Sequence, residues 1–206
     1  MPPQYLLKPT LETKIVKVGD KLMSTVHIRP IKIVDPTGQD QGLTELTLSP
    51  RPSSLQGKRL GLLDNSKANA EVILKAIARI LDEEYEFSEV FYIKKHSASL
   101  PPHPEVLEEL HRNCDMVIAG VGDWGGCSSG SLHDGVTLES QGIPTATIIT
   151  NVFINTAKAY TRLLGIPEFP YLVCPHPITN VGPEGLEERA RLLAPQVKDM
   201  LLYGPA

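Results

Sequence analysis

Five short apolar runs, separated by amphipathic stretches, dominate the sequence from residue 58 to residue 202. The runs cover residues 59–63, 89–93, 115–119, 144–150 and 171–174. Apolar residues recur at helical spacing between them, which predicts helices over residues 67–82, 104–111, 129–141, 152–164 and 183–202. Strands that alternate with helices build a parallel sheet covered on both faces. The pattern predicts an α/β fold with a doubly wound, mostly parallel sheet of about five strands.

The first 56 residues follow a different pattern. Seven of the 18 prolines lie between Pro2 and Pro52, and none lies between residues 53 and 100. Alternating apolar and polar residues in segments 13–18 and 25–29 predict a hairpin that turns at Gly19 and Asp20. We therefore expect an irregular, β-containing N-terminal extension over residues 1–56, made of a hairpin and turns, and an α/β domain over residues 57–206.

Charge and composition argue against several classes of protein. A net charge of −4 and a pI near 5.9 differ from the basic balance typical of nucleic-acid-binding proteins, so we expect no nucleic-acid partner. No run approaches 18 apolar residues and the first residues lack a signal-peptide pattern, so we expect neither a membrane span nor export. Three cysteines, an odd number, do not suit a secreted disulfide framework and favour the reducing cytoplasm.

The segment from Gly120 to Asp134 is the strongest functional signal. An apolar run that ends at Ala119 leads into a turn with four glycines, and the predicted helix follows from Ser129. Cys127 lies in this turn, just before two serines that can cap the helix. Unpaired backbone N–H groups and the positive end of the helix dipole favour a thiolate there. Cys127 is therefore the expected reactive residue; the alternative is a small, inert core cysteine.

Two histidines are candidates for the base that would serve this thiol. His133 lies in the predicted helix that follows Cys127, and His176 follows the last predicted strand. Asp123 is expected to orient the base or to bind substrate. The two histidines, Cys127 and Cys174 are also zinc-type ligands, but no pair has a familiar zinc-binding spacing. The glycines match neither a dinucleotide fingerprint nor a phosphate-binding loop, so we expect no metal and no cofactor.

Ligands of doubly wound sheets bind at the edge where the parallel strands end. Ser66, Lys67 and Asn69 stand at a predicted helix start, and Lys94 and Lys95 stand at the end of a predicted strand. Together these residues can hold a carboxylate or another anion. A capping turn with solvated lysines is the alternative interpretation. The full set of expected substrate-binding residues is Asn65, Ser66, Lys67, Lys95, Trp124, Gly126, Ser128, Ser129, Thr150 and Asn151.

Seven segments of the predicted α/β domain carry a recognisable pattern: Gly61-Leu-Leu-Asp-Asn65, Gly120-Val-Gly-Asp123, Cys127-Ser-Ser129, His133-Asp-Gly135, Leu138-Glu139, Gly142-Ile-Pro-Thr145 and Pro175-His-Pro177. In these segments, which run in order between about residues 58 and 190, the chain resembles the UGSC-like proteins. That bacterial family is named for a turn of selenocysteine (or cysteine), glycine, serine and cysteine. The resemblance implies an α/β domain with a site at this turn.

The chain departs from that family at two positions of the turn. Trp124 stands where the family has its leading selenocysteine or cysteine, and Gly126 stands where it has serine. Cys127 matches the second cysteine of the family. Redox chemistry that rests on the leading residue therefore does not carry over intact, and would need Cys127 to pair with Cys174, with another chain or with an external thiol.

These features lead to one expected function and two alternatives. The expected function is an enzyme whose Cys127 thiolate attacks a small anionic electrophile, in lyase, transferase or hydrolase chemistry. His133 or His176 would act as acid–base, backbone N–H groups of residues 126–129 would stabilise negative charge, and Trp124 would wall the pocket. The alternatives are a thiol oxidoreductase and a non-catalytic small-molecule-binding or partner subunit. A second copy or a related subunit is the expected protein partner.

Overall fold

In the computed structural model, which describes residues 5–18, 21–34 and 46–205, the chain forms two compact units, residues 1–39 and 40–206. The first unit contains an antiparallel hairpin of β1 (Tyr5–Val18) and β2 (Lys21–Val34). Its register runs from Tyr5 opposite Val34 to Val18 opposite Lys21. The predicted hairpin is confirmed, with longer strands than the sequence indicates; the two turn residues lie outside the described residues.

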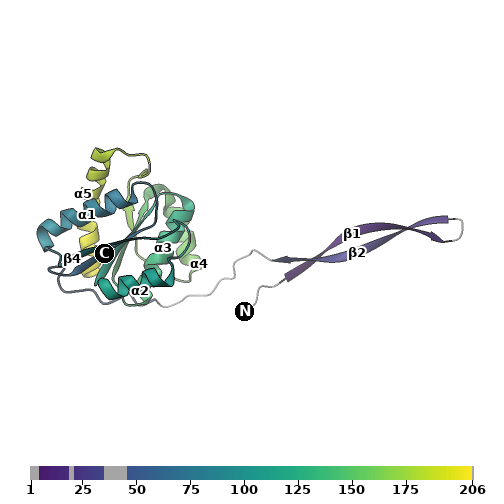
Figure 1. Ribbon diagram of the computed structural model, residues 1–206, viewed down its shortest axis with the longest axis horizontal. Helices are drawn as coiled ribbons and strands as arrows, with labels where there is room; N and C mark the ends of the chain where they lie inside the picture. The colour runs from purple at the N-terminus through teal and green to yellow at the C-terminus, as the bar shows by residue number, and fades with distance from the viewer. Residues whose placement is uncertain (1–4, 19–20, 35–45, 206) are drawn as a thin grey trace. The chain divides into compact units, whose positions relative to one another are not determined.

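The second unit is built on a five-stranded parallel sheet (Figure 1). Its strands are β3 (Arg59–Asp64), β4 (Glu89–Lys94), β5 (Met116–Gly122), β6 (Thr145–Thr150) and β7 (Leu172–Cys174). They lie in the order β4-β3-β5-β6-β7, and every neighbouring pair is parallel. The predicted α/β class and strand number are confirmed.

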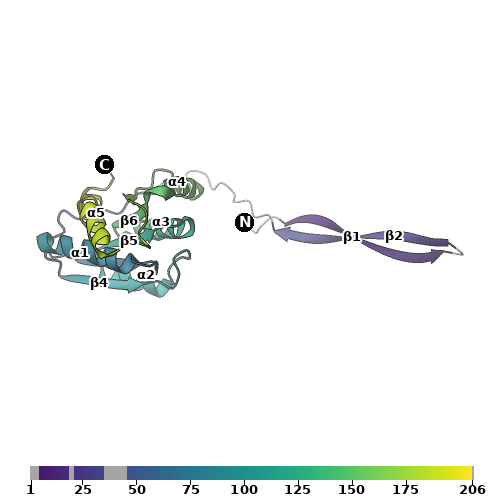
Figure 2. The same ribbon diagram turned by 90° about the horizontal axis from the view of Figure 1, so that it is seen from above.

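Helices cover both faces of this sheet. They are α1 (Ala70–Tyr85), α2 (Pro104–Asn113), α3 (Gly125–Ser140), the 3₁₀ turn η1 (Asn151–Phe153), α4 (Ile154–Leu163) and α5 (Pro183–Tyr203). α1 and α5 pack together against Met116 and Ile118 of β5 (Figures 1 and 2), whereas α2 and α3 cover Val117 and Ala119 on the opposite face. Within the described residues, no helix has the length and apolar character needed to cross a membrane.

The strand order reverses between β3 and β5. These two strands are the first and third of the sheet along the chain but lie side by side, because β4 is placed on the outer side of β3. Connections that leave their carboxyl ends in opposite directions open a crevice, which is where doubly wound sheets bind ligands. The segments that follow Asp64 and Gly122 border this crevice, so the glycine-rich turn lies at the expected edge.

Residues 46–52 belong to the α/β unit. The buried carboxylate of Glu139, on α3, accepts hydrogen bonds from the backbone N–H groups of Ser49 and Thr145, both at 2.7 Å. Arg51 adds an ion pair to the same carboxylate, also at 2.7 Å. Residues 46–52 therefore pack on α3 within the second compact unit.

Two helices begin at other residues than the sequence suggests. α1 begins at Ala70 instead of Lys67, after Asn69 in a left-handed conformation (φ 67°). α3 begins at Gly125 instead of Ser129, which places Cys127 inside its first turn. The prediction that Ser128 and Ser129 cap α3 is therefore wrong, because both serines lie inside the helix and Trp124 is the N-cap residue.

Candidate active site

Cys127 occupies the third helical position of α3. Its Sγ accepts hydrogen bonds from the backbone N–H groups of Asp123 (3.2 Å) and Trp124 (3.0 Å), and the thiol can donate to the Trp124 carbonyl (3.3 Å). The sulfur holds the helix N-terminus as a glutamate at this position does in a capping box. The same N–H donors stabilise negative charge on the sulfur. The residue is only 3% exposed.

Asp123 connects this thiol to an imidazole. Its N–H donates to Sγ of Cys127, and its Oδ1 lies 3.0 Å from Nδ1 of His176. The same carboxylate accepts the backbone N–H groups of Ile178 (3.0 Å) and Thr179 (2.8 Å). One fully buried aspartate therefore holds the thiol, the imidazole and the loop after β7 together.

The pKa of the Asp123 carboxyl lies below its usual value. Burial alone would raise this pKa, but the hydrogen bonds from Thr179 and Ile178, with the nearby imidazole of His176, outweigh burial. Asp123 is therefore a carboxylate at neutral pH and can orient a partner that carries a proton.

His176 directs its Nδ1 toward this carboxylate. Nδ1 also lies 3.2 Å from Oγ1 of Thr150, and the backbone N–H of His176 donates to Oδ1 of Asn151 (3.0 Å). A carboxylate acceptor favours the tautomer protonated at Nδ1, which leaves Nε2 free to take or give a proton. A third of the side chain is exposed, and Phe153 meets the ring edge-on at 5.8 Å.

His133 lies on another side of α3 from Cys127. Six residues separate the two, which corresponds to a rotation of about 240° and a rise of about 9 Å along the helix. Nδ1 of His133 lies 3.4 Å from Oγ1 of Thr137. Burial, with the charge of Lys95, lowers the pKa of His133. Of the two candidate bases, His176 is therefore the one with a structural link to the thiol.

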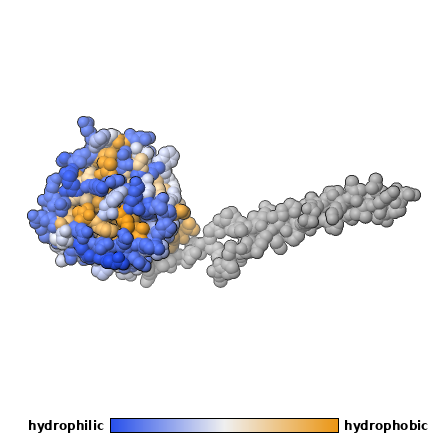
Figure 3. Space-filling view, viewed as in Figure 1, coloured by the Kyte–Doolittle hydropathy of each residue, from blue (hydrophilic) through white to orange (hydrophobic). Residues whose placement is uncertain are grey.

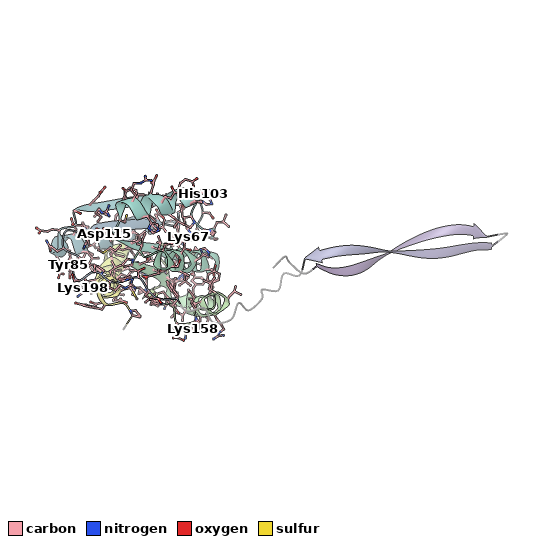
Figure 4. All side chains as sticks on the ribbon, turned by 90° about the horizontal axis from the view of Figure 1, so that it is seen from below. Lys67, Tyr85, His103, Asp115, Lys158 and Lys198 are labelled. Carbon is pink, nitrogen blue, oxygen red and sulfur yellow. The ribbon has the colours of Figure 1, made fainter. Side chains whose placement is uncertain are left out.

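Lys67 and Trp124 meet at the crevice between β3 and β5. Nζ of Lys67 lies 5.0 Å from the centre of the Trp124 ring, at the distance of a cation–π contact, and Trp124 is 58% exposed. Figure 4 labels Lys67 at this edge of the domain and Asp115, which precedes β5, toward the other. Positive charge thus stands beside the first turn of α3, where the N–H groups of Gly125 and Gly126 have no partner among the described residues.

Asn69, expected with Ser66 and Lys67 to help hold an anion, instead completes the framework of the site. Its Nδ2 lies 2.8 to 3.2 Å from the carbonyl oxygens of Ile178, Thr179 and Val181. Asparagine tolerates the left-handed conformation better than most residues, so its place before an apolar helix was a usable signal. Asn69 and Asp123 hold the loop over residues 175–182 from the ends of two neighbouring strands.

Lys95, expected among the substrate-binding residues, lies instead in the interior. Its Nζ bonds Oδ2 of Asp134 (2.5 Å) and the carbonyl of Leu100 (2.9 Å), and the two charged side chains are 0% and 1% exposed. Burial raises the pKa of Asp134 to about 6, although the charge of Lys95 acts in the opposite direction. Lys95 therefore fixes the loop after β4 to α3 and has no surface to offer a ligand.

Asn65 and Ser66 connect elements of the domain. Nδ2 of Asn65 donates to the carbonyl of Val121 (2.8 Å) and to Oγ of Ser131 (3.1 Å) across the crevice. The hydroxyl of Ser66 donates to the carbonyl of Lys95. Both side chains are committed to bonds within the protein, so they shape the crevice rather than line its surface.

The small residues of α3 differ in their access to the site. Ser128 is buried against Gly122. A Cβ atom added to Gly122 would lie only 2.6 Å from the Cα of Ser128. The hydroxyl of Ser129 donates to the carbonyl of Gly125 (3.2 Å). Gly126 is exposed. The N–H of Ser128 is one of the expected backbone donors, but it donates to the Trp124 carbonyl within the helix (2.9 Å).

The other two cysteines have apolar surroundings. Cys114 and Cys174 are buried, and burial raises the pKa of each thiol to about 12. All three cysteines are free. In the part of the chain that the structure describes, no group of three or more His, Cys, Asp or Glu side chains is arranged to hold a metal ion.

Replacing Asp123 by asparagine should lower the free energy of unfolding by about 2–3 kcal/mol at pH 7, because the amide turns a donor toward a buried N–H group. The folded-state pKa of Asp123 is lowered, so its contribution is present above the unfolded pKa and is lost as the pH falls through the folded pKa. The deficit of the variant should therefore shrink below about pH 4. Urea unfolding at both pH values measures this.

The matched control for that variant is Asp115→Asn. Arg59 pairs with Asp115 at 2.8 Å, but this carboxylate is a third exposed. Its removal should cost much less, since water replaces the lost partner. Equal losses in the two variants would contradict the role of Asp123 as the buried connection of the site.

The comparisons with known proteins bear on the family. A model of the UGSC family matches residues 32–203, which include the whole five-stranded sheet and every helix of the α/β unit. Neither the curated proteins nor the solved structures gave a match. The match spans most of the chain and includes the glycine-rich turn with Cys127, as the resemblance in the sequence implied. The chain belongs to the UGSC family.

Proposed function

We propose that the protein is an enzyme in which the Cys127 thiolate attacks a small anionic electrophile. The observation that carries the proposal is the position of Asp123, whose N–H meets the Cys127 sulfur and whose carboxylate meets His176. A nucleophile, a base and a group that orients the base are the parts that covalent catalysis by a thiol requires. All three come from segments at one edge of the sheet.

The thiol and the imidazole divide the chemistry between them. Nε2 of His176 takes the thiol proton, and the sulfur then forms a bond to the electrophilic carbon of the substrate. The electron pair of the broken bond moves onto the leaving group, which takes its proton from Nε2. Water or an acceptor nucleophile then gives its proton to Nε2 and attacks the same carbon, and the electron pair of the carbon–sulfur bond returns to the Cys127 sulfur. Asp123 keeps the Nδ1 proton in place and stabilises the imidazolium between the two steps.

Negative charge on the substrate has partners at the same edge. The N–H groups of Gly125 and Gly126 open α3, and the ammonium of Lys67 stands over the neighbouring Trp124 ring. Backbone donors at a helix N-terminus stabilise both a bound carboxylate and an oxyanion that develops during attack. This combination supports a small carboxylate-bearing substrate in lyase, transferase or hydrolase chemistry.

A thiol oxidoreductase is the main rival. It needs a second thiol to resolve an oxidised Cys127, and a resolving thiol must ionise near neutral pH. The pKa of about 12 for Cys114 and for Cys174 works against either residue in that role. In a binding subunit without catalysis, Cys127 would serve only as a helix cap. The reactivity of its thiol would then not depend on His176.

The test is the rate at which iodoacetamide modifies Cys127 between pH 5 and 9. His176→Gln should slow this reaction about 100-fold near pH 7, because the base that draws off the thiol proton is gone. The control is His133→Gln, which removes the histidine that lies elsewhere on α3 and should leave the rate nearly unchanged. An unchanged rate in His176→Gln, or a slower one in His133→Gln alone, would overturn the assignment.

A further inference from the structure

The edge of the sheet that carries Cys127 exposes apolar as well as charged side chains. Figure 3 shows apolar patches that interrupt the mostly hydrophilic surface of the α/β domain. Among the described residues, the large apolar side chains that are exposed include three in segments that follow strand ends, namely Leu100, Trp124 and Val152, at 55%, 58% and 57%. Exposed apolar side chains that gather at one place mark a contact with a ligand or a partner.

Contacts within the domain bring the first two of these segments together. Ser99, which precedes Leu100, lies against the first turn of α3, because a Cβ atom added to Gly126 would lie 2.9 Å from the Oγ of Ser99. Trp124 is the N-cap residue of the same helix. The loop after β4 therefore stands beside the turn that carries the exposed indole.

The segment after β6 reaches the same place through His176. Nδ1 of His176 lies 3.0 Å from Oδ1 of Asp123, and Asp123 directly precedes Trp124 in the chain. The His176 ring also meets Phe153 edge-on, with 5.8 Å between the ring centres. Val152 precedes Phe153 in the same 3₁₀ turn. The three exposed apolar side chains therefore border the candidate active site from three segments.

Trp124 is the most unusual of the three, because tryptophan is on average highly buried. Nothing among the described residues lies within 4 Å of a Cβ atom added to Gly125, so the space beside the indole is open. Nζ of Lys67 lies 5.0 Å from the centre of the Trp124 ring. This cation–π contact holds an ammonium group beside the ring and leaves apolar indole surface free.

These two side chains describe the chemistry of a ligand that fits them. A flat ring stacks on an indole in an offset arrangement, and such aromatic pairs gain more than the burial of their area alone. A carboxylate on that ring meets the ammonium of Lys67, whose flexible stem lets it follow the charge. An aliphatic carboxylate makes the charged contact but lacks the stacking.

We propose that the substrate of this site is an aromatic carboxylate, whose ring stacks on Trp124 and whose carboxylate meets the ammonium of Lys67. The inference rests on the proposed function, since it places the ring at the edge where Cys127 and His176 lie, and it names the substrate class that this function leaves open. Trp124 selects the flat ring, and Lys67 selects the charge.

Equilibrium binding of two matched carboxylates tests this without turnover. Benzoate and cyclohexanecarboxylate have the same number of carbon atoms and the same charge, but only benzoate is flat. Trp124 is the single tryptophan of the chain, so tryptophan fluorescence reports on this site alone. Benzoate should change the emission and should bind the wild type about fivefold more tightly than cyclohexanecarboxylate. Equal affinities, or no saturable change, would overturn the proposal.

Variants of the indole locate the preference for a flat ring. The amide signals of Gly125 and Gly126 in ¹⁵N–¹H spectra give the two dissociation constants when the tryptophan is absent. Trp124→Leu should bind both carboxylates equally, whereas Trp124→Phe should keep most of the preference for benzoate. The matched control is Tyr203→Leu, which removes an exposed aromatic ring on α5 and should keep the full preference. A preference for benzoate that survives in Trp124→Leu would overturn the proposal.

A variant of the lysine locates the charged contact. Lys67→Met should weaken the binding of both carboxylates about 10-fold and leave their ratio unchanged. The matched control is Lys158→Met, which removes an exposed lysine on α4 and should change neither dissociation constant. Equal effects of the two lysine variants would contradict the role of Lys67.

Failure of this inference is distinguishable from failure of the proposed function. Benzoate has no reactive group, so its binding should be the same in Cys127→Ser as in the wild type. If His176→Gln slows the alkylation of Cys127 but benzoate is not preferred, the aromatic substrate class is wrong. If benzoate is preferred but His176→Gln leaves alkylation unchanged, the ligand site stands and the catalytic assignment falls.

Discussion

Replacing Cys127 by serine should leave the fold in place and lower turnover at least about 1,000-fold, because a serine hydroxyl is a far weaker nucleophile than a thiolate at neutral pH. A hydroxyl can still accept the backbone N–H of Trp124, so α3 should keep its cap. Turnover is measured on a panel of small electrophilic carboxylates, and thermal unfolding reports the fold.

The control for this variant is Cys114→Ala. Cys114 caps the C-terminus of α2 just before β5, at the edge of the sheet opposite the crevice. Its loss should leave turnover close to that of the wild type. Full turnover in Cys127→Ser would refute the nucleophile assignment, and a loss confined to Cys114→Ala would place the chemistry at the wrong edge of the sheet.

Replacing Lys95 by methionine should lower the free energy of unfolding by about 3–5 kcal/mol at pH 8, since it leaves the Asp134 carboxylate unpaired in the interior. Asp134 already has a folded-state pKa of about 6, above its unfolded value, because of burial. A raised carboxyl pKa costs stability above that pKa, and the cost disappears as the pH falls toward the unfolded pKa. The deficit of Lys95→Met should therefore shrink between pH 8 and pH 5 in urea unfolding.

Two further variants distinguish this loss from a general effect of lost charge. Lys95→Met with Asp134→Leu removes both charges and should recover most of the stability, because a buried ion pair adds little over apolar packing. Lys75→Met removes an exposed partner of Glu71 and should change stability little. A large loss in Lys75→Met, or no recovery in the double variant, would contradict the explanation.

The α/β architecture follows from sequence because its signals are local and strong. Continuous apolar runs such as Met116–Ala119 are typical of strands in a sheet that is buried on both faces. The helices that connect these runs favour a parallel arrangement of the strands. The same rule places the segments after β3, β5 and β7 at one edge. The glycine-rich turn with Cys127 and the loop with His176 are therefore predictable at one edge of the sheet, although the two residues are 49 positions apart in the chain.

The remaining features depend on contacts that no local pattern reports. In the sequence, Lys95 looks like a solvated lysine at the end of a strand. Its partner Asp134 lies 39 positions away on α3 and meets it only because the loop after β4 packs on that helix. The start of α3 is missed because Trp124 at the N-cap and Cys127 at the third helical position are residue types seldom assigned a capping role. Asn69 holds three carbonyl groups that lie more than 100 residues away.

The choice between the two histidines also needed the fold. His133 is closer to Cys127 in sequence, but a helix carries it round to a different side. His176 lies 3.0 Å from Asp123, and the same carboxylate fastens the loop that carries this histidine. The sequence offered both side chains as bases, and only the hydrogen bonds of Asp123 separate them.

Competition among the three cysteines of the native protein tests whether Cys127 is the nucleophile. Limited iodoacetamide at pH 7, followed by peptide mass analysis, measures which thiol reacts first. We expect Cys127 to react first, because two backbone N–H groups face its sulfur, whereas burial raises the pKa of Cys114 and of Cys174 to about 12. Earlier modification of Cys114 or Cys174 than of Cys127 would contradict it.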